Sequence, residues 1–172
     1  MSEQFDYIKS KIFIENEIGF INKSVIQYLE TVINESDIGL KIKSINTLRS
    51  KTYEKLNQIQ HEYFLSKAID KMIKLNRISI NDEIIWNPRQ TGDSNEPDIC
   101  IKRNGKIIMC CELTTSNEAK GKIDKRMKEV LEKLNKMVGE KIYIVVSEHM
   151  EKRAKTKIRN LGSNIEVMIL SI

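Results

Sequence analysis

The stretch that decides the fold is EPDICIKRNGKIIMCCELTT, which spans residues 96–115. Two short apolar runs, residues 99–101 and 107–111, flank the dipeptide Asn104-Gly105. An Asn-Gly pair between apolar runs is the strongest short-range indication of a β-hairpin, because both residue types tolerate the positive φ that a tight turn requires. The stretch therefore predicts two antiparallel strands joined by a short loop.

A carboxylate stands at each outer end of this hairpin, Asp98 in front of the first strand and Glu112 at the end of the second. A strict two-residue loop would pair Arg103 with Lys106 and therefore Asp98 with Cys111, which turns Glu112 to the opposite face. A three-residue loop or a bulge would bring the two carboxylates onto one face, where they can share one metal ion. We therefore predict such an irregularity in this hairpin.

Pro97-Asp98 followed by Glu112-Leu113-Thr114 resembles the signature Pro-Asp, spacer, Asp/Glu-x-Lys of the restriction-endonuclease-like PD-(D/E)xK nuclease superfamily. That superfamily includes restriction enzymes, archaeal Holliday-junction resolvases and repair nucleases. The chain departs from the signature at Thr114, which replaces the lysine, and this Glu-x-Thr form looks like the variant in type IIS restriction and nicking endonucleases. The resemblance covers the chain from about residue 60 to residue 147.

The resemblance implies that Asp98, Glu112 and the backbone carbonyl of Leu113 bind Mg²⁺ or Mn²⁺, and that Thr114 positions the attacking water. It also implies an acidic residue from the first core helix, for which Glu62 is the candidate because it shares a helical stripe with apolar residues. Oxygen ligands suit these hard cations, which neutralise a scissile phosphate and lower the pKa of bound water. The alternative is that the hairpin carboxylates only begin and end strands, and that Glu62 lies in water.

Two segments beside the hairpin supply candidate DNA contacts. The polar loop over residues 87–96 leads into the first strand, which would place Arg89 and Gln90 near the scissile phosphate. Residues 115–118 have the pattern of a capping box and predict the start of a helix. Lys120 and Lys122 would then lie close to the metal site, at a helix N-terminus that favours phosphate. A plain connector and ordinary solvated lysines are the alternatives.

The composition favours a polyanionic partner and a reducing compartment. Lysine and arginine number 29 against 24 for aspartate and glutamate, so the net charge is +5 and the pI is about 9.0. This balance is typical of DNA-binding proteins, although many lysine-rich proteins share it. Cys100, Cys110 and Cys111 lie in predicted strands without the spacing of a disulfide framework. The polar N-terminus is unlike a signal peptide, so we expect a cytoplasmic protein without a membrane partner.

Helix and strand patterns divide the chain into two regions. Residues 1–57 predict a helical N-terminal extension with a break at residues 37–39 and helix N-caps at Ser24 and Ser44. A cap on the core, a DNA-binding segment and a subunit-binding segment are its alternative roles. Residues 58–172 predict an α/β fold in which helices flank a mixed sheet. Its first six elements follow the order αβββαβ, which the resemblance implies for a restriction-endonuclease-like core.

The expected function is a Mg²⁺- or Mn²⁺-dependent DNA endonuclease of the restriction type. One active site cuts one strand, so a double-strand cut implies a homodimer or a partner subunit. Three alternatives remain from the sequence. They are a non-catalytic DNA-binding protein on a nuclease-like fold, a Holliday-junction or repair nuclease, and an interaction protein in which the hairpin is incidental.

Overall fold

The computed structural model describes residues 3–87 and 95–170. The chain forms two compact units, which we call the helical unit, residues 6–63, and the sheet unit, residues 1–5 with 64–172. The boundary expected between residues 57 and 58 falls inside one continuous helix, α2, which contributes residues to both units. No helix among the described residues is both long and apolar enough to cross a membrane.

The helical unit is an antiparallel hairpin of α1 (Tyr7–Asn34) and the first part of α2 (Ile38–Lys74). Asp6 caps α1, since its Oδ1 accepts hydrogen bonds from the amides of the first turn at 2.9 and 3.1 Å. Asp37 begins α2 in the same way, at 2.8 Å. The predicted break between two helices is confirmed, but it lies at residues 35–37, and residues 38 and 39 already belong to α2. The predicted N-caps at Ser24 and Ser44 are wrong, because both residues lie inside helices.

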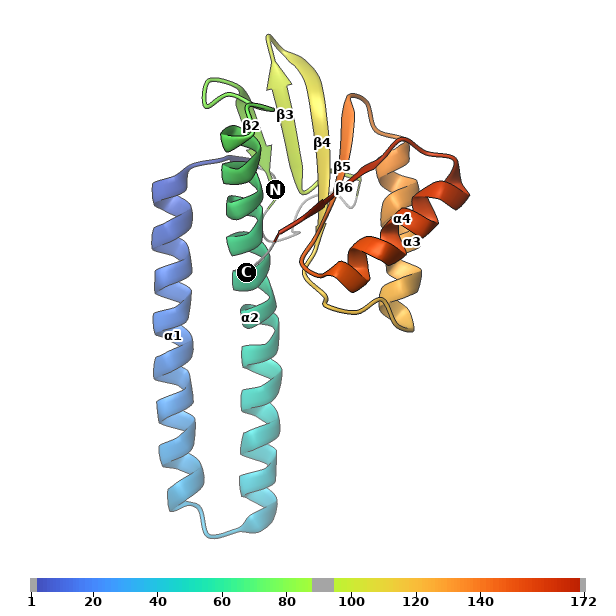
Figure 1. Cartoon of the computed structure of the whole chain (residues 1–172). Helices are drawn as coiled ribbons and strands as arrows, with labels where there is room; N and C mark the ends of the chain where they lie inside the picture. Colours follow the sequence, from blue (N-terminus) through green and yellow to red (C-terminus); the bar gives the residue numbers. More distant parts are fainter. Residues whose placement is uncertain (1–2, 88–94, 171–172) are drawn as a thin grey trace. The chain divides into compact units, whose positions relative to one another are not determined.

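The sheet unit contains a mixed six-stranded sheet whose spatial order follows the chain from β1 to β6 (Figure 1). The pairs from β1 to β4 are antiparallel, and β4, β5 and β6 are parallel. The predicted α/β class with a mixed sheet and flanking helices is therefore confirmed. The elements are β1 (Glu3–Gln4), β2 (Glu83–Trp86), β3 (Ile99–Arg103), β4 (Lys106–Thr114), α3 (Lys122–Asn135), β5 (Glu140–Val145), α4 (Glu148–Leu161) and β6 (Glu166–Ile169).

Each face of the sheet packs against a different set of helices. Leu65 and Ile69, from the part of α2 in the sheet unit, belong to the same apolar cluster as Ile99 and Leu113. Helices α3 and α4 cover the other face, where their apolar side chains pack around Tyr143 (Figure 1). Successive strand residues point to opposite faces, so β4 contributes Cys111 and Leu113 to the first cluster and Cys110 to the second.

The β3–β4 hairpin has the predicted irregularity. Its loop is the two-residue Asn104-Gly105, with φ values of 52° and 74°, and Arg103 pairs with Lys106. A register shift between Ile101 and Lys102 then adds one residue to β4, so that Ile99 pairs with Cys111. Of the two predicted alternatives, a three-residue loop or a bulge, the structure shows the bulge. The bulge turns Asp98 and Glu112 toward one face.

Helix α3 begins later than the sequence predicts. Its first residue is Lys122, behind Gly121, and no side-chain hydrogen bond caps it. The capping box predicted at residues 115–118 is therefore wrong. Contacts with the start of α4 hold this segment instead. The Ser147 hydroxyl donates to the carbonyl of Asn117 at 2.6 Å, and the amide of Ala119 donates to Nδ1 of His149 at 3.4 Å.

Asp82 is expected to stabilise the fold in a pH-dependent way. The Arg103 guanidinium donates to both of its carboxylate oxygens at 2.8 and 2.7 Å, and the amide of Ser79 donates at 2.7 Å. These bonds lower the pKa of Asp82 to about 2. The folded-state pKa lies below the unfolded value of about 4, so this contribution is present above pH 4 and is lost as the pH falls toward 2.

Asp82→Asn should therefore lower the free energy of unfolding at pH 7 by about 1–2 kcal/mol. In urea denaturation, the difference in free energy of unfolding between wild type and Asp82→Asn should fall by about half between pH 5 and pH 3. Glu83→Gln is the control, because Glu83 makes only a surface ion pair with Lys102 at 3.4 Å and should change stability by less than about 0.5 kcal/mol. A difference in free energy of unfolding that does not change with pH would contradict the stabilising role of ionised Asp82.

Candidate active site

Asp98 and Glu112 lie next to each other on the face of the sheet that α3 and α4 cover. Asp98 directly precedes Ile99, and Glu112 directly follows Cys111, the residue that pairs with Ile99. The two carboxylates therefore lie opposite each other at the same end of the ladder. Opposed residues on such strands have Cβ atoms about 4.5–5.5 Å apart. Both side chains are buried, with exposed fractions of 4% and 5%. Two adjacent buried carboxylates are costly unless cations or hydrogen-bond donors accompany them, so the neighbouring groups decide what this pair can do.

Backbone donors hold Asp98 in place at the entrance to β3. Its Oδ2 accepts a hydrogen bond from the amide of Leu113 at 2.7 Å. Its own carbonyl accepts one from the amide of Asn87, the residue after β2, at 2.8 Å. The carboxylate is therefore tied directly to the strand that carries Glu112. Leu113, a predicted metal ligand through its carbonyl, adjoins the pair through its backbone, while its side chain packs on the opposite face.

Lys133, from the second half of α3, supplies a positive charge that the sequence reasoning missed. Its Nζ lies 2.6 Å from Oε1 of Glu112 and donates to the carbonyl of Glu96 at 2.8 Å. The lysine thus links Glu112 to the segment that leads into Asp98. No local pattern singles out Lys133, because it is one of several lysines at the edge of an amphipathic helix. Only the packing of α3 on the sheet identifies it.

Thr114 and Tyr143 form a hydroxyl pair beside the carboxylates. Tyr143 is the residue of β5 that pairs with Glu112, and its Oη lies 2.6 Å from Oγ1 of Thr114. Burial raises the pKa of Tyr143 to about 12; the charges of Glu112 and Asp98 add to this, and the bond to Thr114 opposes it. The phenol therefore stays protonated at neutral pH. Sequence reasoning missed Tyr143. Aligning the two strands β4 and β5 in parallel would have identified it as the neighbour of Glu112.

Among the described ion pairs, none joins the predicted DNA-contact lysines to Asp98 or Glu112. Lys120 and Lys122 are exposed at the start of α3, and Lys120 forms an ion pair with Glu118. Lys122 lies eleven residues before Lys133 in the same helix, which corresponds to about 16 Å along the axis. The second half of the helix supplies Lys133 to Glu112. A role of Lys120 and Lys122 in DNA binding stays a prediction.

The roles of three other predicted residues stay predictions. Arg89 and Gln90 lie outside the described residues. Glu62 lies on α2 within the helical unit, where its side chain is 2% exposed. Burial excludes the alternative of a glutamate in water. Its role at Asp98 and Glu112 stays a prediction, because it belongs to the other unit.

The donor set fits a hard divalent cation. Asp98 and Glu112 supply carboxylate oxygens, and Mg²⁺ commonly binds through one or two carboxylates while it keeps several waters. The Lys133 ammonium beside Oε1 of Glu112 indicates that this position accommodates positive charge. The described residues contain no group of three or more His, Cys, Asp or Glu side chains arranged to hold a metal. The fit therefore rests on two carboxylates and a backbone carbonyl.

The excess positive charge of the protein belongs to the sheet unit. The sequence of that unit contains 21 lysines and arginines and 16 aspartates and glutamates, whereas the helical unit contains eight of each kind. The basic residues of the helical unit are therefore balanced in number by its acidic residues. A polyanion would be attracted to the unit that contains Asp98 and Glu112.

Cys100 is expected to be the most reactive of the three thiols. It pairs with Cys110 across the β3–β4 ladder, and the hydrogen bond between the thiols lowers the pKa of Cys100 to about 7. The same bond raises the pKa of Cys110, and burial raises that of Cys111. Since the thiolate is the nucleophile, iodoacetamide should alkylate Cys100 first, with a half-maximal rate near pH 7. Mass spectrometry of peptides after brief labelling measures this, and faster labelling of Cys110 would contradict it.

The chain has no significant match among protein-family models, curated proteins or solved structures. The resemblance to the restriction-endonuclease-like superfamily therefore stays a prediction from the motif residues.

Proposed function

We propose that this protein is a metal-dependent DNA endonuclease whose active site contains Asp98 and Glu112. One observation carries the proposal: two buried carboxylates, 4% and 5% exposed, flank a single residue pair on the same face of an antiparallel hairpin. A bulge in the hairpin is needed to bring them there. Carboxylates so placed form a site for a hard cation, which is what phosphodiester hydrolysis requires.

Each residue of the site has a role in this proposal. Asp98, Glu112 and the Leu113 carbonyl would hold Mg²⁺ or Mn²⁺, which when bound neutralises phosphate charge and makes a water more acidic. Lys133 provides the positive charge that the signature places at the position of Thr114. The hydroxyl of Thr114, held by Tyr143, orients a water beside the carboxylates. Positioned charges and donors of this kind commonly supply the largest part of catalysis.

The arrangement of elements supports the same proposal. A helix, three antiparallel strands, a helix and a parallel strand follow one another in α2, β2, β3, β4, α3 and β5. This is the αβββαβ order implied by the resemblance to restriction-endonuclease-like nucleases. The net positive charge of the sheet unit suits a nucleic-acid substrate, although fold and charge alone do not establish an activity.

Cleavage of supercoiled plasmid DNA tests the proposal. Wild-type protein should nick or linearise the plasmid with Mg²⁺ or Mn²⁺ and not with EDTA, most strongly at low salt, because phosphate contacts weaken as salt rises. A second candidate function, non-catalytic DNA binding, is favoured by the ion pair between Lys133 and Glu112, which would then be structural. Salt-sensitive DNA binding without metal-dependent cleavage would establish that alternative.

Lys133→Met is expected to slow metal-dependent cleavage by about a hundred-fold, the usual effect of removing one positioned donor. Lys133→Arg keeps the charge and should restore part of the rate. Lys136→Met is the matched control, because Lys136 is an exposed lysine at the end of the same helix. Initial rates at saturating Mg²⁺ distinguish the variants. Equal rates for Lys133→Met and Lys136→Met would show that Lys133 has no role in catalysis.

A further inference from the structure

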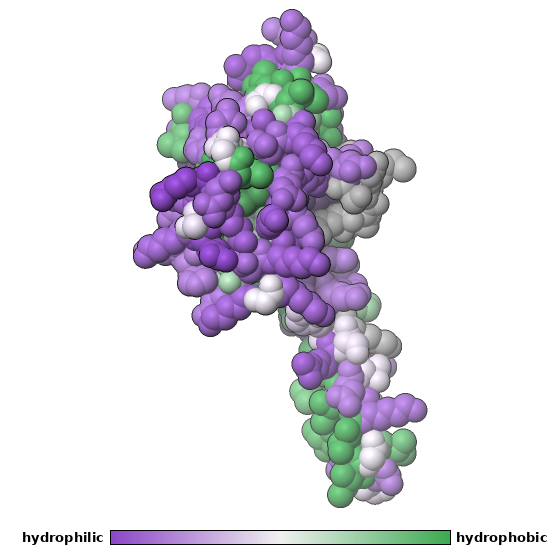
Figure 2. Space-filling view, turned by 90° about the vertical axis from the view of Figure 1, so that its right-hand side faces the viewer, coloured by the Kyte–Doolittle hydropathy of each residue, from purple (hydrophilic) through white to green (hydrophobic). Residues whose placement is uncertain are grey.

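Most of the described large apolar side chains of the helical unit are exposed. Among its described large apolar side chains only Ile21 and Ile59, at 8% and 9%, are less than a tenth exposed. Figure 2 shows apolar residues on the surface of the lower, projecting end of the helical unit. Side chains between 46% and 74% exposed are Ile8, Ile12, Ile18, Phe20, Ile26, Leu29, Ile33, Ile38, Leu40, Ile42, Ile45, Tyr53 and Leu56.

The size of this surface is that of a protein–protein interface. Together these side chains leave on the order of 1,000 Å² of apolar area in water, whereas the largest patch on a typical monomer covers about 300–600 Å². A specific interface buries about 800 Å² on each partner. Helices in proteins also depend on packing of an apolar face for most of their stability. The surface is therefore large enough for a stable dimer.

The exposed side chains follow a repeat along each helix. In α1, Ile8, Ile12, Ile26, Leu29 and Ile33 lie on the series 8, 12, 15, 19, 22, 26, 29, 33, whose middle positions are Glu15, Gly19 and Asn22. In α2, Ile38, Ile42, Ile45, Tyr53 and Leu56 lie on the series 38, 42, 45, 49, 53, 56, 60, 63, which also contains Arg49 and Gln60. Ile18, Phe20 and Leu40 lie off these series. Steps of three and four residues are typical of a helix that packs along a second helix. These two rows are separate from the row containing Ile21 and Ile59, which faces inward. Each helix thus has one apolar row facing its neighbour and another facing outward.

The two outward rows lie on the same side of the hairpin. Glu17 and Lys55 form an ion pair at 2.7 Å, and the Lys55 ammonium lies 4.1 Å from the centre of the Phe20 ring, which sets the antiparallel register. At about 100° per residue, each outward row is turned by roughly 100–130° from the inward row of its helix. The helices run in opposite directions, so these rotations bring both rows to one side. Leu29 then lies level with Ile45.

The charge of the helical unit suits association with an identical copy. Its eight lysines and arginines are balanced by eight aspartates and glutamates. Two copies therefore meet without net repulsion, and the unit has no net charge to attract a polyanion. Of the roles that the sequence leaves open for this region, subunit binding agrees best with both the charge and the apolar rows.

We propose that the apolar side of this hairpin is covered by the same side of a second copy of the chain, so that two hairpins form a four-helix bundle. Such an interface is isologous, since each copy contributes the same surface. Antiparallel four-helix bundles bury apolar rows of this spacing in a shared core. The dimer rests on the helical unit alone and does not depend on the proposed nuclease activity.

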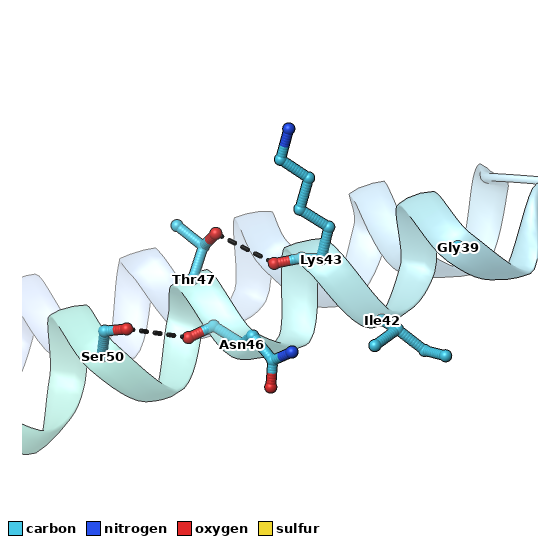
Figure 3. Close-up of a pocket in the computed structure, with 6 residues that line it drawn as sticks. All are labelled: Gly39, Ile42, Lys43, Asn46, Thr47 and Ser50. Carbon is cyan, nitrogen blue, oxygen red and sulfur yellow. Dashed lines mark hydrogen bonds between the residues drawn. The ribbon is translucent and has the colours of Figure 1, made fainter.

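A shallow depression on α2 borders the outward row but carries no ligand site of its own. Gly39, Ile42, Lys43, Asn46, Thr47 and Ser50, all from one helix, line it (Figure 3). The hydroxyls of Thr47 and Ser50 donate to backbone carbonyls of the same helix, at 2.9 and 3.0 Å. Small side chains at the edge of an apolar row allow close approach of another helix.

Sedimentation equilibrium of the full chain tests the dimer. Wild type should sediment at twice the chain mass of 20.0 kDa. Ile45→Glu and Leu29→Glu each place a charge in the interface and should raise the dimer dissociation constant at least about a hundred-fold. Leu40→Glu is the matched control, because Leu40 is 50% exposed, against 52% for Ile45, and lies on the other side of α2. Its dissociation constant should stay within about three-fold of wild type.

Circular dichroism distinguishes dissociation from unfolding. At a protein concentration near the dissociation constant of the dimer, a variant that only dissociates should keep most of its helical signal. A monomeric wild type at 100 μM, or a Leu40→Glu variant as weakened as Ile45→Glu, would overturn the proposal. The mass from sedimentation equilibrium tests the dimer, and plasmid cleavage tests the nuclease. Failure of one proposal can therefore be distinguished from failure of the other.

Discussion

Asp98→Asn and Glu112→Gln are each expected to slow metal-dependent DNA cleavage by about a thousand-fold or more. Both changes preserve shape and remove one of two negative charges that would hold the metal. A thousand-fold loss corresponds to about 4 kcal/mol of transition-state stabilisation, which is within the range that a bound metal ion supplies. Initial rates of plasmid nicking at saturating Mg²⁺ measure the effect. DNA binding should persist, because the phosphate contacts come from other residues.

Glu83→Gln provides the matched control for these variants. It removes one negative charge from a neighbouring strand, β2, at a side chain that is half exposed and lies outside the site. Its cleavage rate should stay within about two-fold of wild type, since a surface ion pair contributes little. If Glu83→Gln and Asp98→Asn lost activity equally, or if Asp98→Asn stayed active, the two carboxylates would not be the metal site.

Gly139→Ala is expected to lower the free energy of unfolding by about 2–4 kcal/mol. Gly139 joins the end of α3 to β5 with a φ of +80°, and a Cβ there would lie 2.7 Å from the carbonyl carbon and oxygen of Ile108. Both the backbone conformation and the contact with β4 therefore oppose a side chain. Chemical denaturation followed by the fluorescence of Trp86, the single and buried tryptophan, measures the loss.

Gly162→Ala separates the effect of the positive φ from the effect of the close contact with β4. Gly162 follows α4 with a φ of +63°, and a Cβ added there meets nothing within 4 Å. Only the conformational cost of about 1 kcal/mol should remain. Equal losses for the two variants would show that the close approach of Gly139 to β4 does not contribute.

The hairpin at the centre of the fold could be predicted from sequence because its determinants are local. Asn104-Gly105 defines the turn, and the apolar runs define the strands. The bulge between Ile101 and Lys102 was also predictable, although indirectly, because only an irregularity can place Asp98 and Glu112 on one face. Register and turn chemistry together carry this information, and neither depends on distant parts of the chain.

Features that depend on distant contacts could not be predicted. The segment after Thr114 has the residues of a capping box, yet bonds from Ser147 and to His149 hold it outside a helix. Tertiary contacts there outweigh a local preference worth about 1 kcal/mol. Lys133 reaches Glu112 only because α3 packs on the sheet with its second half over β4. Composition and spacing do not specify that placement.

The central claim is that Asp98 and Glu112 form one metal site, and anomalous diffraction from crystals grown with Mn²⁺ tests it most directly. We predict an anomalous peak within about 2.2 Å of a carboxylate oxygen from each residue. The peak should disappear in Asp98→Asn crystals. Absence of a peak at this position in wild-type crystals soaked with Mn²⁺, with Lys133 still in contact with Glu112, would contradict the claim and assign the pair a structural role.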